Sequence, residues 1–364
     1  MSLSSAATLL KYVAGTAATG SVLVAGGLWY FQRHLIYPSN LPSGSRTDVP
    51  TPAQIGLPYE DITLTTNDHL KLHAYLIPAR RRPVTLQDLQ SLSNEDRKAR
   101  MKAEVDGWVE EMGKEDAVEY IKSRPTVVFF HANAGNMGHR LPLARKFNVE
   151  HGCNVFMLSY RGYGKSEGHA SELGMRIDVE AALQYIQAHP LIGKTKLIVY
   201  GQSIGGAVSL YAAASHPDMI SGIIIENTFL SLPLLIPSIM PQIPRFLLPI
   251  LLTEQWDAAL SLPKIRKSTP ILMLSGKKDE LVPPSHMVEL RRIREGGRVQ
   301  EASWQEEGQA ANAAREKKDL GGKVRWREFP SGTHNDTCLI PGYWKEIGEW
   351  IREEVEGLPV EKGE

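Results

Sequence analysis

The chain has 364 residues, with 41 basic and 41 acidic side chains and a formal net charge of zero. This balance gives no reason to expect a nucleic-acid-binding protein, which needs a basic face, and a hydrophobic content of 42% excludes global disorder. Only two cysteines are present, so a disulfide scaffold and a four-cysteine zinc site are excluded. Composition leaves open whether Cys153 and Cys338 are free thiols or form one disulfide.

The first feature along the chain is an uncharged stretch at residues 12–31, bracketed by Lys11 and Arg33. A helix of this length measures roughly 30 Å, the thickness of a bilayer core. We therefore expect residues 1–34 to form one transmembrane helix that anchors the protein. A cleaved signal peptide and a buried helix are the alternatives, and the nearly equal positive charge on the two flanks leaves the topology open.

The next segment, residues 35–358, alternates apolar runs with helical patterns. Eight runs are typical of strands: 60–65, 70–77, 125–131, 154–159, 196–200, 222–226, 270–275 and 324–329. The middle runs are almost continuously apolar, as in parallel strands that are covered on both faces. The alternation predicts an α/β fold, with a mostly parallel eight-stranded sheet between two helical layers.

Two charged segments, residues 84–124 and 291–323, interrupt this pattern, and a short polar tail follows at 359–364. We interpret both segments as helical insertions with solvated faces; a role in docking a partner is the alternative. Without these insertions and the anchor, the remaining length suits a single α/β domain rather than two.

The third predicted strand leads into residues 131–136, a loop rich in glycine and asparagine. In enzymes that attack carbonyl groups, backbone N–H groups of such loops stabilise the developing negative charge. We assign this oxyanion-hole role to the backbone N–H of Asn133, together with that of Ile204. The alternative is a plain turn without a catalytic part.

The pattern G-x-S-x-G occurs twice, around Ser166 and around Ser203. A nucleophilic serine in this pattern needs a strand before it and a helix directly after it, so that its hydroxyl stands exposed on a sharp turn. Ser203 follows the strand predicted at 196–200 and precedes a strong helix former at 206–214. Ser166 lies in a loop, so we predict that Ser203 is the nucleophile and that Ser166 belongs to a structural turn.

Residues 228–263 are apolar and are broken by six prolines, which favours several short helices over one long one. They lie where a lid would cover the site. An apolar lid next to a membrane anchor favours a lipidic acyl group. Inward packing of these side chains as ordinary core is the alternative.

The partners of a catalytic serine follow it in the order acid, then histidine. Asp279 comes directly after the strand at 270–275, and His334 lies on the loop after the strand at 324–329. We predict that His334 is the base and that Asp279 orients it. The alternatives are that Asp279 is a solvent-exposed turn residue, or that Glu226, at the end of the preceding strand, has the role of the acid. No metal-ligand cluster and no phosphate-binding loop is found, so no cofactor and no metal is expected.

Several motifs occur in a characteristic order: Leu-Ile-Tyr-Pro at 35–38, His-Ala-Asn-Ala-Gly-Asn at 131–136, Tyr-Arg-Gly-Tyr-Gly-Lys-Ser at 160–166, Gly-Gln-Ser-Ile-Gly-Gly at 201–206 and Gly-Thr-His-Asn-Asp at 332–336. Together with Asp279, they resemble the α/β-hydrolase superfamily. Within it they resemble the membrane-anchored family of bud-emergence protein 46 and α/β-hydrolase domain-containing protein 13.

The resemblance implies a single-pass membrane protein, often at the endoplasmic reticulum, with acyl-ester or thioester hydrolase activity. The expected substrate is a lipid or an acylated protein, cleaved through a Ser-His-Asp triad and an acyl-enzyme. A serine peptidase with the same triad and a non-catalytic membrane scaffold are the alternatives. A glycosylation sequon at Asn335 lies beside the predicted base, and a glycan there would crowd the site, which favours a cytosolic catalytic domain. The alternative is that the sequon is simply unused.

Overall fold

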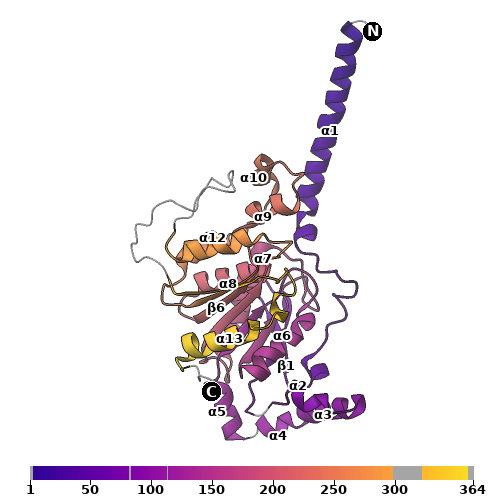
Figure 1. The fold of residues 1–364 in the computed structure, drawn as a ribbon. Coiled ribbons are helices and arrows are strands. Elements are labelled where there is room, and N and C mark those ends of the chain that lie inside the picture. Colours follow the sequence, from indigo (N-terminus) through magenta and orange to yellow (C-terminus); the bar gives the residue numbers. More distant parts are fainter. Residues whose placement is uncertain (1–2, 82, 113, 298–321, 360–364) are drawn as a thin grey trace.

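An eight-stranded sheet forms the centre of the protein in the computed structural model, which describes residues 3–81, 83–112, 114–297 and 322–359 (Figure 1). The strands are β1 (Glu60–Thr65), β2 (Lys71–Ile77), β3 (Thr126–Phe130), β4 (Asn154–Leu158), β5 (Leu197–Gln202), β6 (Ile220–Glu226), β7 (Ile271–Gly276) and β8 (Val324–Phe329). They lie in the order β1-β2-β4-β3-β5-β6-β7-β8. The pairs β1–β2 and β2–β4 are antiparallel, and all other neighbours are parallel.

All eight predicted strands are present, and their ends differ from the predicted ones by two residues at most. Every residue of β3, β4, β5 and β7 is buried. Burial on both faces explains why these strands are continuously apolar instead of alternating. The predicted α/β architecture, with a mostly parallel sheet, is therefore confirmed.

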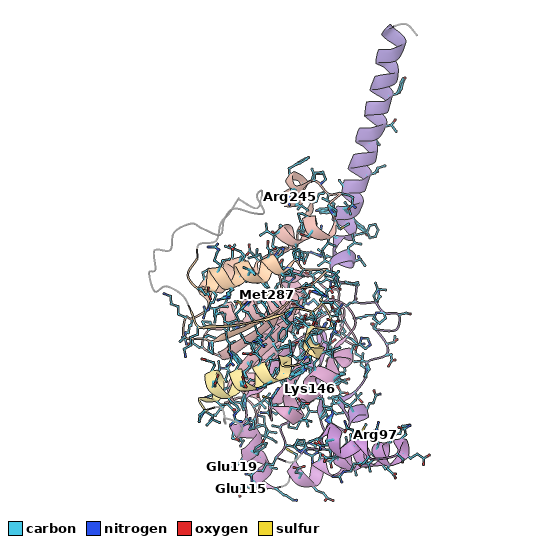
Figure 2. The ribbon with its side chains drawn as sticks, in the orientation of Figure 1. Arg97, Glu115, Glu119, Lys146, Arg245 and Met287 are labelled. Carbon is cyan, nitrogen blue, oxygen red and sulfur yellow. The ribbon has the colours of Figure 1, made fainter. Side chains whose placement is uncertain are left out.

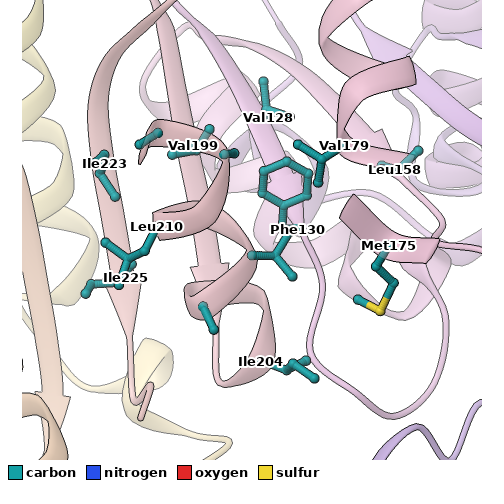
Figure 3. Packing of buried hydrophobic residues seen from close by; sticks show 14 of the residues in the cluster. Val128, Phe130, Leu158, Met175, Val179, Val199, Ile204, Leu210, Ile223 and Ile225 are labelled. Atoms are coloured by element: carbon teal, nitrogen blue, oxygen red, sulfur yellow. The ribbon is translucent and has the colours of Figure 1, made fainter. Parts of the chain in front are cut away.

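Helices cover both faces of the sheet. The helices of the described residues are α1 (Leu3–Ile36), α2 (Leu86–Gln90), α3 (Asn94–Asp106), α4 (Trp108–Met112), α5 (Glu115–Ser123), α6 (Leu141–Arg145), α7 (Glu172–Ala188), α8 (Ile204–Ser215), α9 (Leu232–Ile239), α10 (Leu248–Leu251), α11 (Ala258–Ser261), α12 (Pro284–Arg294) and α13 (Tyr343–Trp350). Side chains of α7, α8 and α12 form one apolar core with the sheet, part of which Figure 3 shows, and those of α6 and α13 form a second core on the other face. Both cysteines are buried free thiols.

The charged segment at 84–124 forms the four short helices α2 to α5, at the end of the molecule opposite the N-terminus of α1 (Figure 1). Its longest helix, α3, has no buried residue, as expected for a solvated insertion. Arg80 ties this segment to the body through ion pairs with Glu104 and Glu111. The second predicted insertion begins within α12, but residues 298–321 lie outside the described residues, as do 360–364 of the tail.

Helix α1 continues two residues beyond the predicted anchor limit, to Ile36, and its N-terminal part projects away from the body (Figure 1). In the described part of the chain, none of the helices meets the length and apolarity needed to cross a bilayer, α1 included. At its C-terminal end, α1 lies beside the predicted lid segment, which forms α9, α10 and α11 as several short pieces. Figure 2 places Arg245 of the lid at the end of the body from which α1 emerges.

Candidate active site

Ser203 occupies the sharp turn between β5 and α8. Its backbone has φ 56° and ψ −123°, a conformation that residues other than glycine rarely adopt. Two hydrogen bonds hold the turn: Ser203 N–H donates to the Glu226 carbonyl at 2.9 Å, and the Thr228 hydroxyl donates to the Ser203 carbonyl at 2.6 Å. Strained strand-to-helix turns of this kind carry the nucleophilic serine of the G-x-S-x-G pattern.

The glycines around Ser203 are required by close packing of the backbone. A Cβ at Gly201 would lie 2.0 Å from the Gly205 carbonyl oxygen, and a Cβ at Gly205 would lie 2.2 Å from the Phe130 carbonyl oxygen. Both distances are far below van der Waals contact. The G-x-S-x-G pattern therefore lets the start of α8 press against the end of β3, where the predicted oxyanion loop begins.

Asp279 and His334 meet at the carboxyl ends of β7 and β8. His334 Nδ1 lies 2.8 Å from Asp279 Oδ2 and 3.0 Å from Oδ1, and both side chains are buried. Asp279 Oδ1 also accepts hydrogen bonds from the backbone N–H groups of Leu281 and Val282, at 2.9 and 2.8 Å. The carboxylate is thereby fixed behind the imidazole, the position of the acid in a catalytic triad.

The alternative acid, Glu226, is held elsewhere. Its carboxylate accepts hydrogen bonds from the hydroxyls of Tyr200, at 2.8 Å, and Tyr343, at 2.5 Å. Complete burial raises the pKa of Glu226, because desolvation disfavours its charged form. Asp279, and not Glu226, is the carboxylate that contacts His334 Nδ1.

The loop that follows β3 is held in place by tyrosine side chains. The Tyr163 hydroxyl donates to the Asn133 carbonyl at 2.8 Å, and the Tyr160 hydroxyl donates to the His131 carbonyl at 3.2 Å. Burial lowers the pKa of His131 to about 3, so this imidazole is neutral. The Asn133 side chain donates to the Ile36 carbonyl of α1 at 3.1 Å, which ties the loop to the base of that helix.

The second G-x-S-x-G serine has a different environment. Ser166 is completely buried, its hydroxyl donates to the Ser159 carbonyl at 2.7 Å, and it accepts from His73 N–H at 2.9 Å. A buried hydroxyl with both of these hydrogen bonds stabilises the turn and is not available to a substrate. The structure therefore agrees with the interpretation of Ser166 as part of a structural turn.

Ser203, His334, Asn133 and Ile204 line one cavity of about 290 Å³, and Asp279 lies behind His334. The structure thus brings all five predicted site residues together. Apart from these residues the cavity is almost entirely apolar, and its walls come from the lid and the end of α1. In the described ranges, no group of three His, Cys, Asp or Glu side chains is placed to hold a metal ion.

The chain is similar to known proteins over almost its whole length. A model of the family described as "alpha/beta hydrolase fold" matches residues 125–252. Protein bem46 of Schizosaccharomyces pombe is 41% identical over 358 residues, which cover 97% of this chain and 96% of that protein. The chain belongs to the bem46 family of α/β hydrolases. The family expected from the motifs is therefore confirmed.

Two other similar proteins are 34% identical to this bem46-family chain. They are the "uncharacterized membrane protein YNL320W" of Saccharomyces cerevisiae, with 94% of this chain and 96% of that protein covered, and the "alpha/beta hydrolase domain-containing protein WAV2" of Arabidopsis thaliana, with 90% of each. Among solved structures, the Pyrococcus furiosus esterase Pf2001 has a TM-score of 0.55 at 16% identity and covers 84% of this chain and 96% of its own. At this identity, the likeness shows the fold alone.

Two residues that the sequence analysis did not single out hold the histidine loop of this bem46-family chain. Gln202 Nε2 donates to the His334 carbonyl at 2.6 Å. Asn227 Nδ2 donates to the Thr333 carbonyl at 3.1 Å, and Asn227 Oδ1 accepts from Gly276 N–H at 2.8 Å. Both residues lie at the carboxyl ends of strands, where open α/β sheets place their sites, and this is the signal that could have identified them.

Proposed function

We propose that the chain is a serine hydrolase that cleaves acyl esters or thioesters. The observation that carries this proposal is the buried His334–Asp279 pair, at 2.8 Å, whose imidazole lines the same cavity as a serine on a strained strand-to-helix turn. A binding protein has no need of this combination. The apolar lining of the cavity supports an acyl group as the part of the substrate that is bound.

In the proposed mechanism, Ser203 Oγ attacks the carbonyl carbon while His334 Nε2 takes its proton. Asp279 orients the imidazole through Nδ1 and stabilises the imidazolium that forms. The backbone N–H groups of Asn133 and Ile204 bind the oxyanion of the tetrahedral intermediate. His334 then gives its proton to the departing alcohol or thiol, and a water molecule, deprotonated by the same imidazole, releases the acid from Ser203.

We also propose that α1 attaches the enzyme to a membrane, of the endoplasmic reticulum or another endomembrane. The support is that a 34% identical relative is called a membrane protein, and that α1 carries exposed aromatic side chains at Trp29, Tyr30 and Phe31. Aromatic residues of this kind favour the interface between lipid and water. The substrate that fits this location is a lipid ester or an acylated protein.

One experiment tests both proposals. Membranes from cells that express the full chain are treated with a fluorophosphonate probe and then washed with alkaline carbonate. We expect the probe to label the wild type and not Ser203→Ala, because only a base-activated serine is phosphonylated. Ser166→Ala is the matched control from the second motif, and we expect it to be labelled like the wild type. The labelled chain should stay in the carbonate pellet and dissolve in detergent.

Each outcome has a separate meaning. Absence of labelling, or equal labelling of Ser203→Ala, overturns the hydrolase and favours a non-catalytic scaffold. Release of the labelled chain by carbonate overturns the membrane attachment and leaves the hydrolase standing. Turnover of a peptide p-nitroanilide in preference to an acyl ester and an acyl thioester would identify a peptidase with the same triad.

A further inference from the structure

The cavity at Ser203 has walls from two parts of the chain that are far apart in sequence. One wall is the lid, with Leu235, Ile239 and Ile243. The other is the last part of α1, with Leu28, Gln32, Leu35 and Ile36. These four residues follow a helical spacing of about three to four, so they form one stripe on the helix. Without α1, one side of the cavity would be open.

The side of α1 that lines the cavity is held to the lid by Gln32, which is 8% exposed. Gln32 Nε2 donates to the Leu251 carbonyl at 3.0 Å. Gln32 Oε1 accepts from the Thr253 N–H at 2.8 Å and from the Thr253 hydroxyl at 3.0 Å. A buried amide with both ends paired sets the rotation of a helix as well as its position, because a slip would leave these groups unsatisfied.

A second set of contacts holds the helix just below the cavity. The Tyr37 hydroxyl donates to Glu254 Oε2 at 2.6 Å and accepts from Trp256 Nε1 at 2.8 Å. Arg33 Nε donates to Glu254 Oε1 at 2.9 Å. Glu254 is 2% exposed, so its contact with Tyr37 is a charge-assisted hydrogen bond in a nearly dry environment, whereas the Arg33 side chain is 55% exposed. Helix α1 is therefore docked on the body as a fixed part of the site.

We propose that α1 is part of the substrate-binding site, and that the acyl chain of the substrate lies against Leu28, Leu35 and Ile36 of this helix. This inference rests on the proposed hydrolase function, since the occupant is defined by the carbonyl that Ser203 attacks. The segment that carries the membrane attachment thereby also determines which acyl chains are accepted. The exposed side of the same helix faces away from the cavity, with Tyr30 70% exposed.

The size of the effect follows from the burial of methylene groups. Each methylene that enters an apolar site raises binding about fourfold. A larger side chain at Leu28 takes space from the distal part of the acyl chain, and a smaller one adds space. Substitutions at this position therefore change the preferred chain length in opposite directions, which a general loss of stability would not do.

The test uses the full chain with Leu28→Trp and Leu28→Ala. Hydrolysis is measured on p-nitrophenyl esters from acetyl to dodecanoyl. We expect Leu28→Trp to lower the kcat/KM ratio of dodecanoyl to butanoyl ester by about tenfold or more, equal to about two excluded methylenes. Leu28→Ala should move the optimum toward longer chains. Tyr30→Trp, two positions away on the exposed side of the helix, is the matched control and should leave the chain-length profile unchanged.

A second measurement separates this inference from the proposed function. The same substitutions are placed in Ser203→Ala, and the dissociation constant of a fluorescent dodecanoic acid is measured by titration. Weaker binding with Leu28→Trp but not with Tyr30→Trp supports the α1 wall, even if the wild type hydrolyses no ester and the proposed function fails. Equal profiles and equal binding for Leu28→Trp and Tyr30→Trp overturn it, whether or not esters are hydrolysed.

Discussion

At the scale of single residues, Asn227 combines an unusual backbone with a specific side-chain role. It has φ 45°, in the left-handed region that asparagine tolerates better than most residues. Its amide connects the ends of β6 and β7 with the loop of His334: it donates to the Thr333 carbonyl and the Thr337 hydroxyl, both at 3.1 Å. Asn227 touches no reacting atom in the proposed mechanism, so it acts by positioning His334.

We predict that Asn227→Gly lowers ester hydrolysis by about a hundredfold, because small displacements of a catalytic group have costs of this size. Glycine accepts the positive φ, so the substitution removes the amide without straining the backbone. The control is His69→Gly, at an exposed residue with φ 66°, where no change in kcat/KM is expected. If Asn227→Gly kept the kcat/KM of the wild type, the positioning role would be wrong. The measurement is steady-state kinetics on a short ester.

The site residues differ in how far the sequence predicts them. Ser203 could be separated from Ser166 because a strand and a strong helix former flank it directly, and this order is a local property of the chain. Asp279 and His334 follow predicted strands of a parallel sheet, whose carboxyl ends meet. Asn227 and Gln202 lie at strand ends, which could have marked them as candidates, but their role in holding the His334 loop could not be predicted, because it depends on hydrogen bonds to a loop more than a hundred positions away.

At the scale of elements, the attachment of α1 depends on a few buried polar contacts. We predict that Tyr37→Phe lowers the free energy of unfolding by about 1–3 kcal/mol, since it leaves the indole N–H of Trp256 without its partner and removes one hydrogen bond to the buried carboxylate of Glu254. Tyr30→Phe, at an exposed position of α1, is the control. The check is urea denaturation in detergent. Equal stability of the two variants would contradict a structural role for the Tyr37 hydroxyl.

For α1, the sequence predicts the helix but not the place where it docks on the body. The strands were predictable because continuous burial leaves an apolar run in the sequence itself. The uncharged stretch predicts a helix but not where it is held: the pairs Tyr37–Glu254 and Gln32–Thr253 join residues 217 and 221 positions apart. The predicted anchor limit of residue 34 therefore falls inside the helix, before the tyrosine that fixes its end.

At the scale of the whole molecule, the fold keeps a group of buried histidines neutral. Burial lowers the pKa of His131 to about 3 and the pKa values of His151 and His286 to about 4. The ordinary value is 6.5, so the unfolded chain binds protons at a pH where the folded chain does not. His286 uses its neutral ring to support the lid, because Nδ1 accepts from the Leu230 N–H at 3.2 Å.

This difference predicts that the protein loses stability as the pH falls from about 6.5 toward 4. Stability rises with pH wherever the unfolded state binds more protons, so the contribution of each buried histidine is complete above 6.5 and decreases below it. For His286 the loss by pH 4 is on the order of 3 kcal/mol. The free energy of unfolding, measured by urea denaturation at several pH values, should therefore fall less steeply in His286→Gln than in the wild type. His69→Gln, at an exposed position, should keep the wild-type slope; equal slopes for all three proteins would show that His286 is not kept neutral by the fold.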